Sequence, residues 1–172
     1  MAPSQLYSQL YELAKRHGEG DDILSIRSPD ATHAWGHNRL VSLNPTLQDV
    51  MDNEAFAAHL NTTGRLLAGF NSKIHHITVD EHQRMATIRM SYYLSTITSD
   101  EVVENDLIWT LKFTKQGEIK GDPNAVLIKE SIEFVDATAN ARLGALIRDA
   151  QVKIGKDVKG CLLYTSPSPR DS

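Results

Sequence analysis

The chain has 172 residues, of which 41% are hydrophobic and 23% charged, and its formal net charge at pH 7 is −4. These values are typical of one globular domain with a single hydrophobic core. No basic stripe occurs, which argues against a surface for nucleic acid or for an anionic membrane.

The single cysteine, Cys161, excludes an intrachain disulfide and a cysteine-based metal site. The opening residues, MAPSQLYSQL, lack the basic and apolar regions of a secretory signal. No apolar run approaches the roughly 18–20 residues that a membrane span needs. We therefore expect a soluble, cytoplasmic protein.

The first predicted element is an amphipathic helix over SQLYSQLYELAKRHG, capped by Ser4 and ended by Gly18. The basic group at its end, Lys15 to His17, is interpreted as a solvated helix end that favours the dipole. The apolar face of this helix consists of Leu6, Leu10 and Leu13.

Residues 20–27 predict a short second helix that stops before Pro29, because the residue before proline avoids the α region. Residues 31–36 predict a short strand, and residues 37–51 a loop over the core. Asp52 or Asn53 caps a third helix that extends to about residue 69. Its apolar stripe is Phe56, Leu60 and Leu67.

Four strands are predicted between Lys73 and Asp136, and a closing helix begins near Thr138. Successive strand residues face opposite sides of a sheet, so each strand divides into two sets. The apolar set of each strand also contains ionisable or polar residues: His75, Tyr92, Asn105, Glu130 and Asp136. Burying these without partners would cost about 1–3 kcal/mol each. We therefore predict a cavity lined by them.

Two segments depart from the pattern. GDPNAVL, residues 121–127, interrupts the last hairpin, and it predicts a wide loop, a bulge or an inserted segment. A bulge would turn Glu133 inward in place of Glu130. The sequence from residue 155 onward predicts a disordered or artefactual tail, so the domain is expected to span residues 1–154.

Helices followed by antiparallel strands and a closing helix indicate an α+β class, with a curved sheet closed into a cone by the first and third helices. The 37–51 loop is expected at the mouth of this cone.

The stretches RSPDATHAWGH, DNEAFAAHL, VENDLIWTLKF and IEFVD resemble, in order and spacing, the small fungal SnoaL-like isomerases and cyclases of meroterpenoid and polyketide pathways. These have the cone-shaped nuclear transport factor 2-like fold. The resemblance covers roughly residues 5–140, except for a longer 37–51 loop and the GDPNAVL segment, both of which we expect near the substrate. It implies a homodimer that needs no metal or organic cofactor and rearranges a hydrophobic intermediate by proton transfer.

Such a reaction needs a base, a donor for the developing oxyanion and an acid. Asp136 is a candidate acid or base, although Asp before Ala-Thr-Ala also fits a helix N-cap. His75 and His33 are acid/base candidates, and the resemblance places a histidine after an SPD-like start in the cavity. Tyr92 and Asn105 are candidate donors. Each has an ordinary structural alternative as a core or strand-end residue.

The remaining histidines rank lower. His76 and His82 are expected on the outside, and His59 is interpreted as a residue flanking the buried stripe of the third helix. A metal site from His33, His37 and His75 would lack an acidic ligand with supporting spacing.

The sequence contains no nucleotide-binding loop, no serine-hydrolase elbow and no zinc-protease motif. We therefore predict a cofactor-independent isomerase or cyclase acting on a hydrophobic small molecule. The alternatives are a dehydratase or epoxide hydrolase on the same fold, or a non-catalytic cone that binds a hydrophobic ligand or a protein partner.

Overall fold

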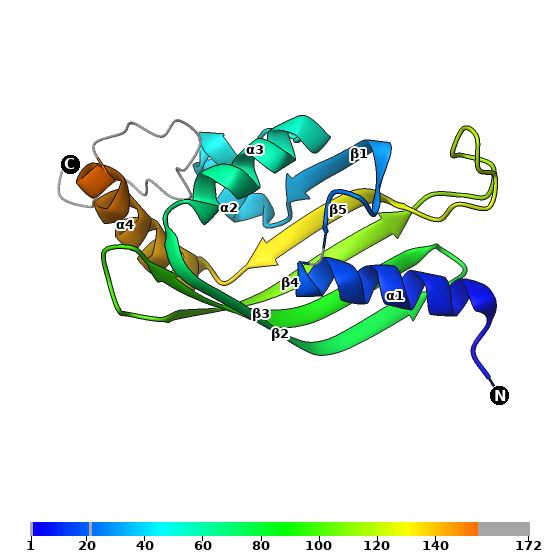
Figure 1. Ribbon diagram of the computed structural model, residues 1–172, viewed down its shortest axis with the longest axis horizontal. Coiled ribbons are helices and arrows are strands. Elements are labelled where there is room, and N and C mark those ends of the chain that lie inside the picture. Colours follow the sequence, from blue (N-terminus) through cyan, green and yellow to red (C-terminus); the bar gives the residue numbers. More distant parts are fainter. Residues whose placement is uncertain (1, 21, 155–172) are drawn as a thin grey trace.

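The computed structural model describes residues 2–20 and 22–154, so the predicted tail lies outside the described residues. The fold is α+β, with a curved sheet packed by helices (Figure 1). Its elements in order are α1 (Gln5–Glu19), β1 (Arg27–Trp35), α2 (Asn38–Leu43), the 3-10 helix η1 (Pro45–Leu47), α3 (Asn53–Gly64), β2 (Leu67–Asp80), β3 (Met85–Thr96), β4 (Val103–Phe113), β5 (Ile128–Val135) and α4 (Ala137–Ile154).

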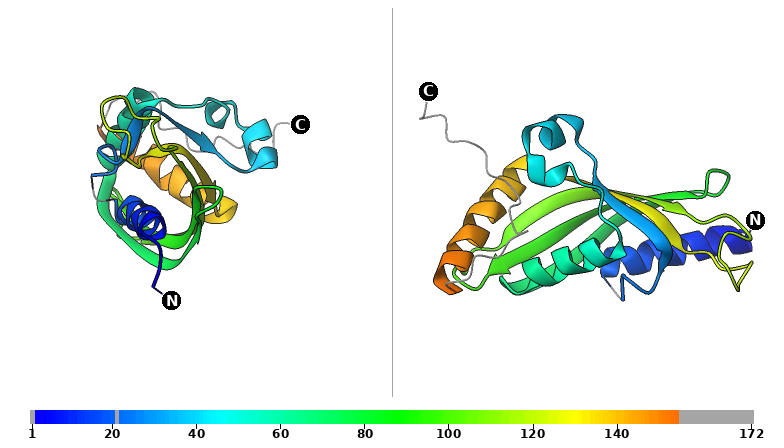
Figure 2. Two further views of the ribbon diagram at one scale, coloured as in Figure 1. Left: turned by 90° about the vertical axis from the view of Figure 1, so that its right-hand side faces the viewer. Right: turned by 90° about the horizontal axis from the view of Figure 1, so that it is seen from above.

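The five strands form one sheet in the order β1-β5-β4-β3-β2. The β1–β5 pair is parallel and the other three pairs are antiparallel. Figure 2 shows the sheet curving around α1, with α3 beside it and α4 at one end. The predicted cone is therefore present.

The first helix begins as predicted, because the Ser4 hydroxyl accepts a hydrogen bond from the Tyr7 amide at 2.9 Å. It ends later than predicted, at Glu19, and is capped by Gly20, whose φ of 74° is the left-handed conformation that glycine adopts readily. Gly18 lies inside the helix and is buried.

The predicted helix over residues 20–27 is wrong. The backbone forms a turn there, with the Ser25 amide bonded to the Asp22 carbonyl at 3.0 Å, and β1 already begins at Arg27. The strand begins this early because the Ile128 amide of β5 donates a hydrogen bond to the Ile26 carbonyl. Pro29 is tolerated in β1 because this strand is an edge of the sheet.

The third helix is capped by Asp52, whose carboxylate accepts from the Ala55 amide at 2.8 Å. It ends at Gly64, earlier than predicted, because the chain from Leu67 onward pairs with β3. The predicted 37–51 loop contains α2 and η1.

Two irregularities in the ladders change which side chains face inward. The β2–β3 register shifts between Ile74 and His76, and the β4–β5 register shifts between Lys112 and Phe113. The second shift confirms the bulge interpretation of the last strand: Glu130 faces outward to Lys112, and Glu133 faces inward.

The concave face of the sheet and α1 share the main core, which includes Leu10, Ile88, Trp109 and Phe113. A second cluster joins α4 to the ends of β3 and β4. No helix in the described ranges is long and apolar enough to cross a membrane.

Candidate active site

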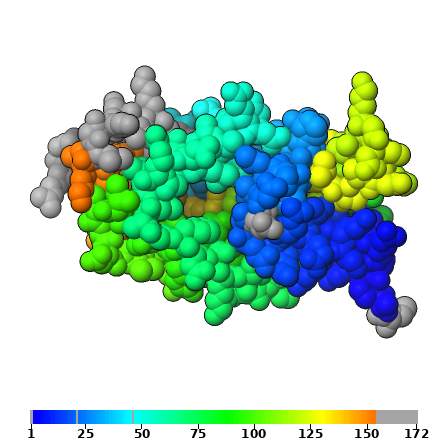
Figure 3. Space-filling model, viewed as in Figure 1, coloured from blue at the N-terminus to red at the C-terminus, as the bar shows by residue number. Residues whose placement is uncertain are grey.

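A cavity of about 440 Å³ lies between the concave face of the sheet and the helices. Its walls come from the end of α1, from Trp35 at the end of β1, from α3, from the first half of β2, from β3, β4 and β5, and from α4. Figure 3 shows a hollow in the surface between the α3–β2 segment and the segment that follows α1. The volume is in the range of small-molecule sites.

Glu133 is the one carboxylic acid among the described residues that line this cavity. In the sheet register it lies between two indoles, opposite Trp35 on β1 and opposite Trp109 on β4. No hydrogen bond or ion pair from another described residue reaches its carboxyl group. Burial raises the pKa of Glu133 from 4.5 to about 8, so the group is largely protonated at pH 7.

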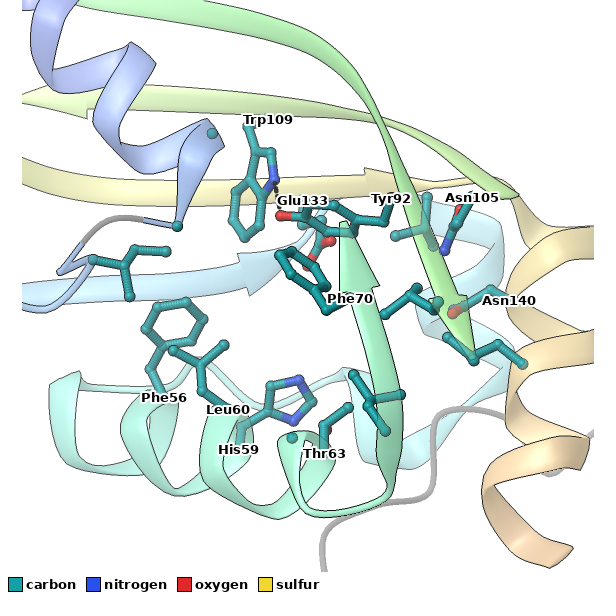
Figure 4. A pocket seen from close by; sticks show the side chains of 18 of the residues that line it. Phe56, His59, Leu60, Thr63, Phe70, Tyr92, Asn105, Trp109, Glu133 and Asn140 are labelled. Atoms are coloured by element: carbon teal, nitrogen blue, oxygen red, sulfur yellow. Dashed lines mark hydrogen bonds between the residues drawn. The ribbon is translucent and has the colours of Figure 1, made fainter. Parts of the chain in front are cut away.

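Tyr92 points into the cavity from β3 and meets the indole of Trp109 (Figure 4). Nε1 of Trp109 donates a hydrogen bond to the Tyr92 hydroxyl oxygen at 3.1 Å. Burial and, next, the nearby charge of Glu133 raise the pKa of Tyr92. The phenol therefore keeps its proton and can donate it to a ligand.

His59 extends from α3 into the cavity, and its ring meets Trp35 edge-on with ring centroids 5.8 Å apart. Burial lowers the pKa of His59, so the imidazole is neutral at pH 7. A neutral imidazole has one nitrogen lone pair and can accept a proton. Sequence reasoning ranked His59 low because it placed Leu60 on the buried stripe, but Leu60 is more exposed than His59.

His17 reaches the cavity from the last turn of α1 and is almost fully buried, with 1% of its surface exposed. Both ring nitrogens lack a partner among the described residues, and the ring packs edge-on against Trp109. Burial, followed by the positive charge of Arg27, lowers the pKa of His17 to about 3. The interpretation of this residue as a solvated helix end is wrong.

His33 shares the inner face of β1 with Trp35, as predicted, but it does not line the cavity. Its ring is buried against Phe56 and Trp109, which do line the cavity. Nδ1 lies 3.2 Å from the hydroxyl of Ser131, while Nε2 has no partner among the described residues. Burial is the main cause that lowers the pKa of His33 to about 3.

His75 does not point inward, which corrects the sequence expectation. The register shift before His76 adds one residue to β2, so His75 turns to the outer face while Ile74 and Ile77 both face the core. There its Nε2 lies 2.8 Å from the hydroxyl of Ser91. His33, His37 and His75 are therefore not brought together.

Asp136 also lies outside the cavity. Its carboxylate accepts hydrogen bonds from the amides of Thr138 at 2.7 Å and Ala139 at 2.8 Å, so it caps α4. The helix-cap alternative that the sequence left open is the one that the structure supports. The side chain is exposed and adjoins a shallower hollow on the outer face of the sheet.

Asn105 lines the cavity from β4, as predicted, opposite Tyr92 in the β3–β4 ladder. Its amide oxygen accepts from the backbone amide of Asp136 at 3.2 Å. A second buried amide, that of Asn140 on α4, lines the same end of the cavity. Within the described chain, no cluster of three His, Cys, Asp or Glu side chains could hold a metal ion.

Neither irregular segment reaches the cavity. Residues 37–51 and residues 121–127 are absent from its walls, so the expectation that they grip substrate is wrong. The connection between β4 and β5 projects from the end of the sheet opposite α4 (Figure 1).

The sequence matches no protein-family model and no curated protein. Solved structures do match. PrhC from Penicillium brasilianum aligns over 92% of this chain and 97% of its own, at 17% identity and a TM-score of 0.69. The BvnE pinacolase from Penicillium brevicompactum aligns over 89% and 97%, at 18% identity and a TM-score of 0.64. A Jannaschia protein described as a SnoaL-like polyketide cyclase aligns over 81% and 93%, at 12% identity and a TM-score of 0.58.

The chain has the SnoaL-like fold. This confirms the fold that the sequence resemblance predicted. At these identities the likeness establishes the architecture, and the chemistry has to be argued from the side chains of this SnoaL-like cone.

Two buried residues of the SnoaL-like cavity were missed although the sequence carried a signal for each. His17 continues the stripe of Leu6, Leu10 and Leu13 at the next helical step, four residues on. Asn140 precedes Leu143 by three residues on the buried face of α4. A polar residue that continues an apolar stripe is a candidate cavity residue.

Proposed function

We propose that this protein is a cofactor-independent isomerase or cyclase that rearranges a polyketide or meroterpenoid intermediate by general acid/base proton transfer. The observation that carries the proposal is the placement of Glu133. An unpaired carboxyl group between two indoles, inside an apolar cavity, is costly for folding and suited to catalysis.

Two side chains in the proposed mechanism donate hydrogen bonds to the substrate, those of Glu133 and Tyr92. A carboxyl group held neutral by an apolar site can donate a hydrogen bond at pH 7. Protonated Glu133 and the Tyr92 hydroxyl are therefore the groups that would stabilise negative charge on a substrate carbonyl oxygen. Such preorganised donors act most strongly where charge develops in the transition state.

The base in this mechanism is His59. Its neutral imidazole faces the cavity from α3, across from the sheet that carries Glu133 and Tyr92 (Figure 4). It would accept a proton from the carbon next to the carbonyl, giving an enolate held by the two donors and a protonated imidazole. Return of that proton to a different atom of the substrate, or attack of the enolate carbon on an electrophile, would give the isomerised or cyclised product.

The structural neighbours support this class of reaction. Among them are a pinacolase and a protein described as a polyketide cyclase, and two of them come from Penicillium species. We accordingly propose a reaction of secondary metabolism with a hydrophobic small molecule as the substrate. The working unit that we propose is a homodimer, which only the sequence resemblance implies.

The alternatives fit the cavity less well. A dehydratase or epoxide hydrolase that uses a carboxylate and a histidine on a water or hydroxyl could draw on Glu133 and His59, but a Glu133 that is largely protonated at pH 7 is better suited to donate than to activate water as a carboxylate base. A non-catalytic binding cone would explain the cavity but not the unpaired acid in its wall.

The test is deletion of the gene in its host, isolation of the compound that accumulates, and incubation of that compound with the purified protein without added cofactor. We expect conversion by the wild type and a loss of about 100-fold or more in kcat for Glu133→Leu, which removes the donor. The matched control is Glu130→Leu, which removes a carboxylate three residues away on the outer face. No conversion by the wild type, or equal rates for both variants, would overturn the proposal.

A further inference from the structure

Two buried amides mark the end of the cavity that α4 closes. Asn105 and Asn140 are each 3% exposed, and Figure 4 shows both side chains at the α4 side of the site. They meet around the first turn of α4: the Asp136 amide donates to the Asn105 side-chain oxygen, and the Asp136 carbonyl accepts from the Asn140 backbone amide at 2.9 Å.

The described residues use only part of the hydrogen-bonding capacity of this pair of side chains. A backbone amide can only donate, so its bond fixes the Asn105 oxygen and leaves the NH₂ group of Asn105 as a donor without a partner among the described residues. Asn140 Nδ2 is buried and likewise has no partner among the described residues. A half-turn of the Asn140 amide presents either its nitrogen or its oxygen to the cavity.

The buried nitrogen of Asn140 needs a partner that the described residues do not provide. Leaving it unsatisfied costs about 1–3 kcal/mol, whereas a leucine at this position would carry no such cost. The surrounding wall is apolar, with Leu94, Val135 and Leu143 nearby in the lining. A ligand oxygen reaching this end would satisfy the amides.

The charge of the cavity limits what that oxygen can belong to. Among the described residues that line it there is no lysine and no arginine. Burial keeps the imidazoles of His17 and His59 neutral at pH 7, so they supply no counter-charge. A carboxylate placed here would lose its hydration without gaining a cation.

We propose that Asn105 and Asn140 form a second recognition subsite, which binds an uncharged carbonyl or ester oxygen of the substrate away from the reacting carbonyl. This inference rests on the proposed function, and it defines the substrate class as a neutral, apolar molecule with at least two oxygen functions. The subsite adjoins Tyr92, the cross-strand partner of Asn105.

A binding experiment tests the subsite without any turnover. Both tryptophans of the chain line the cavity, so intrinsic fluorescence reports its occupancy. The probes are decalin-1,5-dione, 1-decalone and 5-oxodecalin-1-carboxylate, which share one ketone and differ in the second group. We expect the wild type to bind the dione about tenfold more tightly than the monoketone, and the anion most weakly.

Asn140→Leu should reduce the affinity for the dione to that for 1-decalone and leave the affinity for 1-decalone unchanged. Because it removes an unsatisfied buried amide, its thermal midpoint should not fall. The control is Asn61→Leu on the exposed side of α3, which should leave all three affinities unchanged.

The proposal is overturned if the wild type binds none of the probes, if it binds the anion as tightly as the dione, or if Asn140→Leu weakens both ketones equally. These outcomes are separate from a failure of the proposed function, which would appear as retained turnover in Glu133→Leu.

Discussion

The indole nitrogen of Trp109 donates to the phenol oxygen of Tyr92 across 3.1 Å, and this bond determines what the phenol can do. One lone pair of the oxygen is occupied, and the hydroxyl proton has no acceptor among the described residues. The proton is therefore free to point into the cavity. The bond that Tyr92 accepts from Trp109 fixes its hydroxyl oxygen, and its own proton stays available for a ligand oxygen. A preorganised donor of this kind can stabilise an oxyanion.

Tyr92→Phe removes that donor while keeping the ring. With the compound that accumulates on gene deletion as substrate, we expect kcat to fall by about 10²–10³, the usual effect of losing one oxyanion donor. The free energy of unfolding should change little, because Trp109 loses one hydrogen bond but no buried space opens. Steady-state kinetics and urea unfolding check the two expectations.

Tyr93→Phe is the matched control for this variant. Tyr93 is the next residue on the same strand, faces outward, and donates to Glu104 at 3.0 Å. The Tyr93→Phe variant should retain the kcat of the wild type. A similar loss in both variants would mean that the Tyr92 effect arises from the stability of β3 and not from the cavity.

The acid form of Glu133 is the proposed working form, so the pH profile should show it. Because burial raises the pKa of Glu133 to about 8, kcat/KM should be level from about pH 6 to 7.5 and fall above about pH 8. Glu133→Gln should lack this falling limb. A rate that instead rises toward pH 8 would assign Glu133 as the base and exclude its role as a donor.

The same shift predicts a stability change of known sign. Between pH 4.5 and 8 the folded protein keeps the Glu133 proton and the unfolded chain releases it, so the free energy of unfolding falls as pH rises. The contribution is about 1.4 kcal/mol per pH unit across that window. Urea unfolding of the wild type and of Glu133→Gln at pH 5.5 and 7.5 measures the difference, and parallel pH dependences would show that the carboxyl is solvated.

The sequence predicted the fold class because it depends on repeated, local signals. The alternation in β3 and β4 places Tyr92 and Asn105 on the cavity face, as the structure does. The alternation rule failed at His75 because one extra residue in β2 reverses the face of the sheet assigned to the β2 residues before it. A bulge is set by pairing with the neighbouring strand, which the single strand does not encode.

The site was predicted less well because its members come from elements distant in the chain. His17 and His59 were each judged within their own helix, where a histidine looks like a flanking or solvated residue. Their burial results from α1 and α3 packing over the concave face of one sheet. Glu133 was considered only as the outcome of a bulge, and the structure contains that bulge.

Asp136 should behave as a helix cap and not as a catalytic group. Asp136→Ala removes the acceptor for the Thr138 and Ala139 amides, so we expect a loss of about 1 kcal/mol in the free energy of unfolding with kcat unchanged. Asp136→Asn keeps a capping oxygen and should retain most of the stability. A tenfold or larger loss of kcat in Asp136→Asn, with normal stability, would return this residue to the mechanism.

His17 should make the protein sensitive to acid. Its pKa is about 3 in the folded protein and near 6.5 when unfolded, so below pH 6.5 only the unfolded chain takes up the proton. The free energy of unfolding therefore falls with pH, by about 2 kcal/mol from this residue at pH 5. His17→Phe preserves the edge-on contact with Trp109 and removes two unpartnered nitrogens. We expect it to be more stable than the wild type at pH 7 and to lose less stability at pH 5.

The control is His82→Phe in the exposed turn between β2 and β3, which should leave the acid sensitivity intact. Equal acid sensitivity in His17→Phe and the wild type would show that the imidazole is hydrated in the folded cavity and open to protonation there.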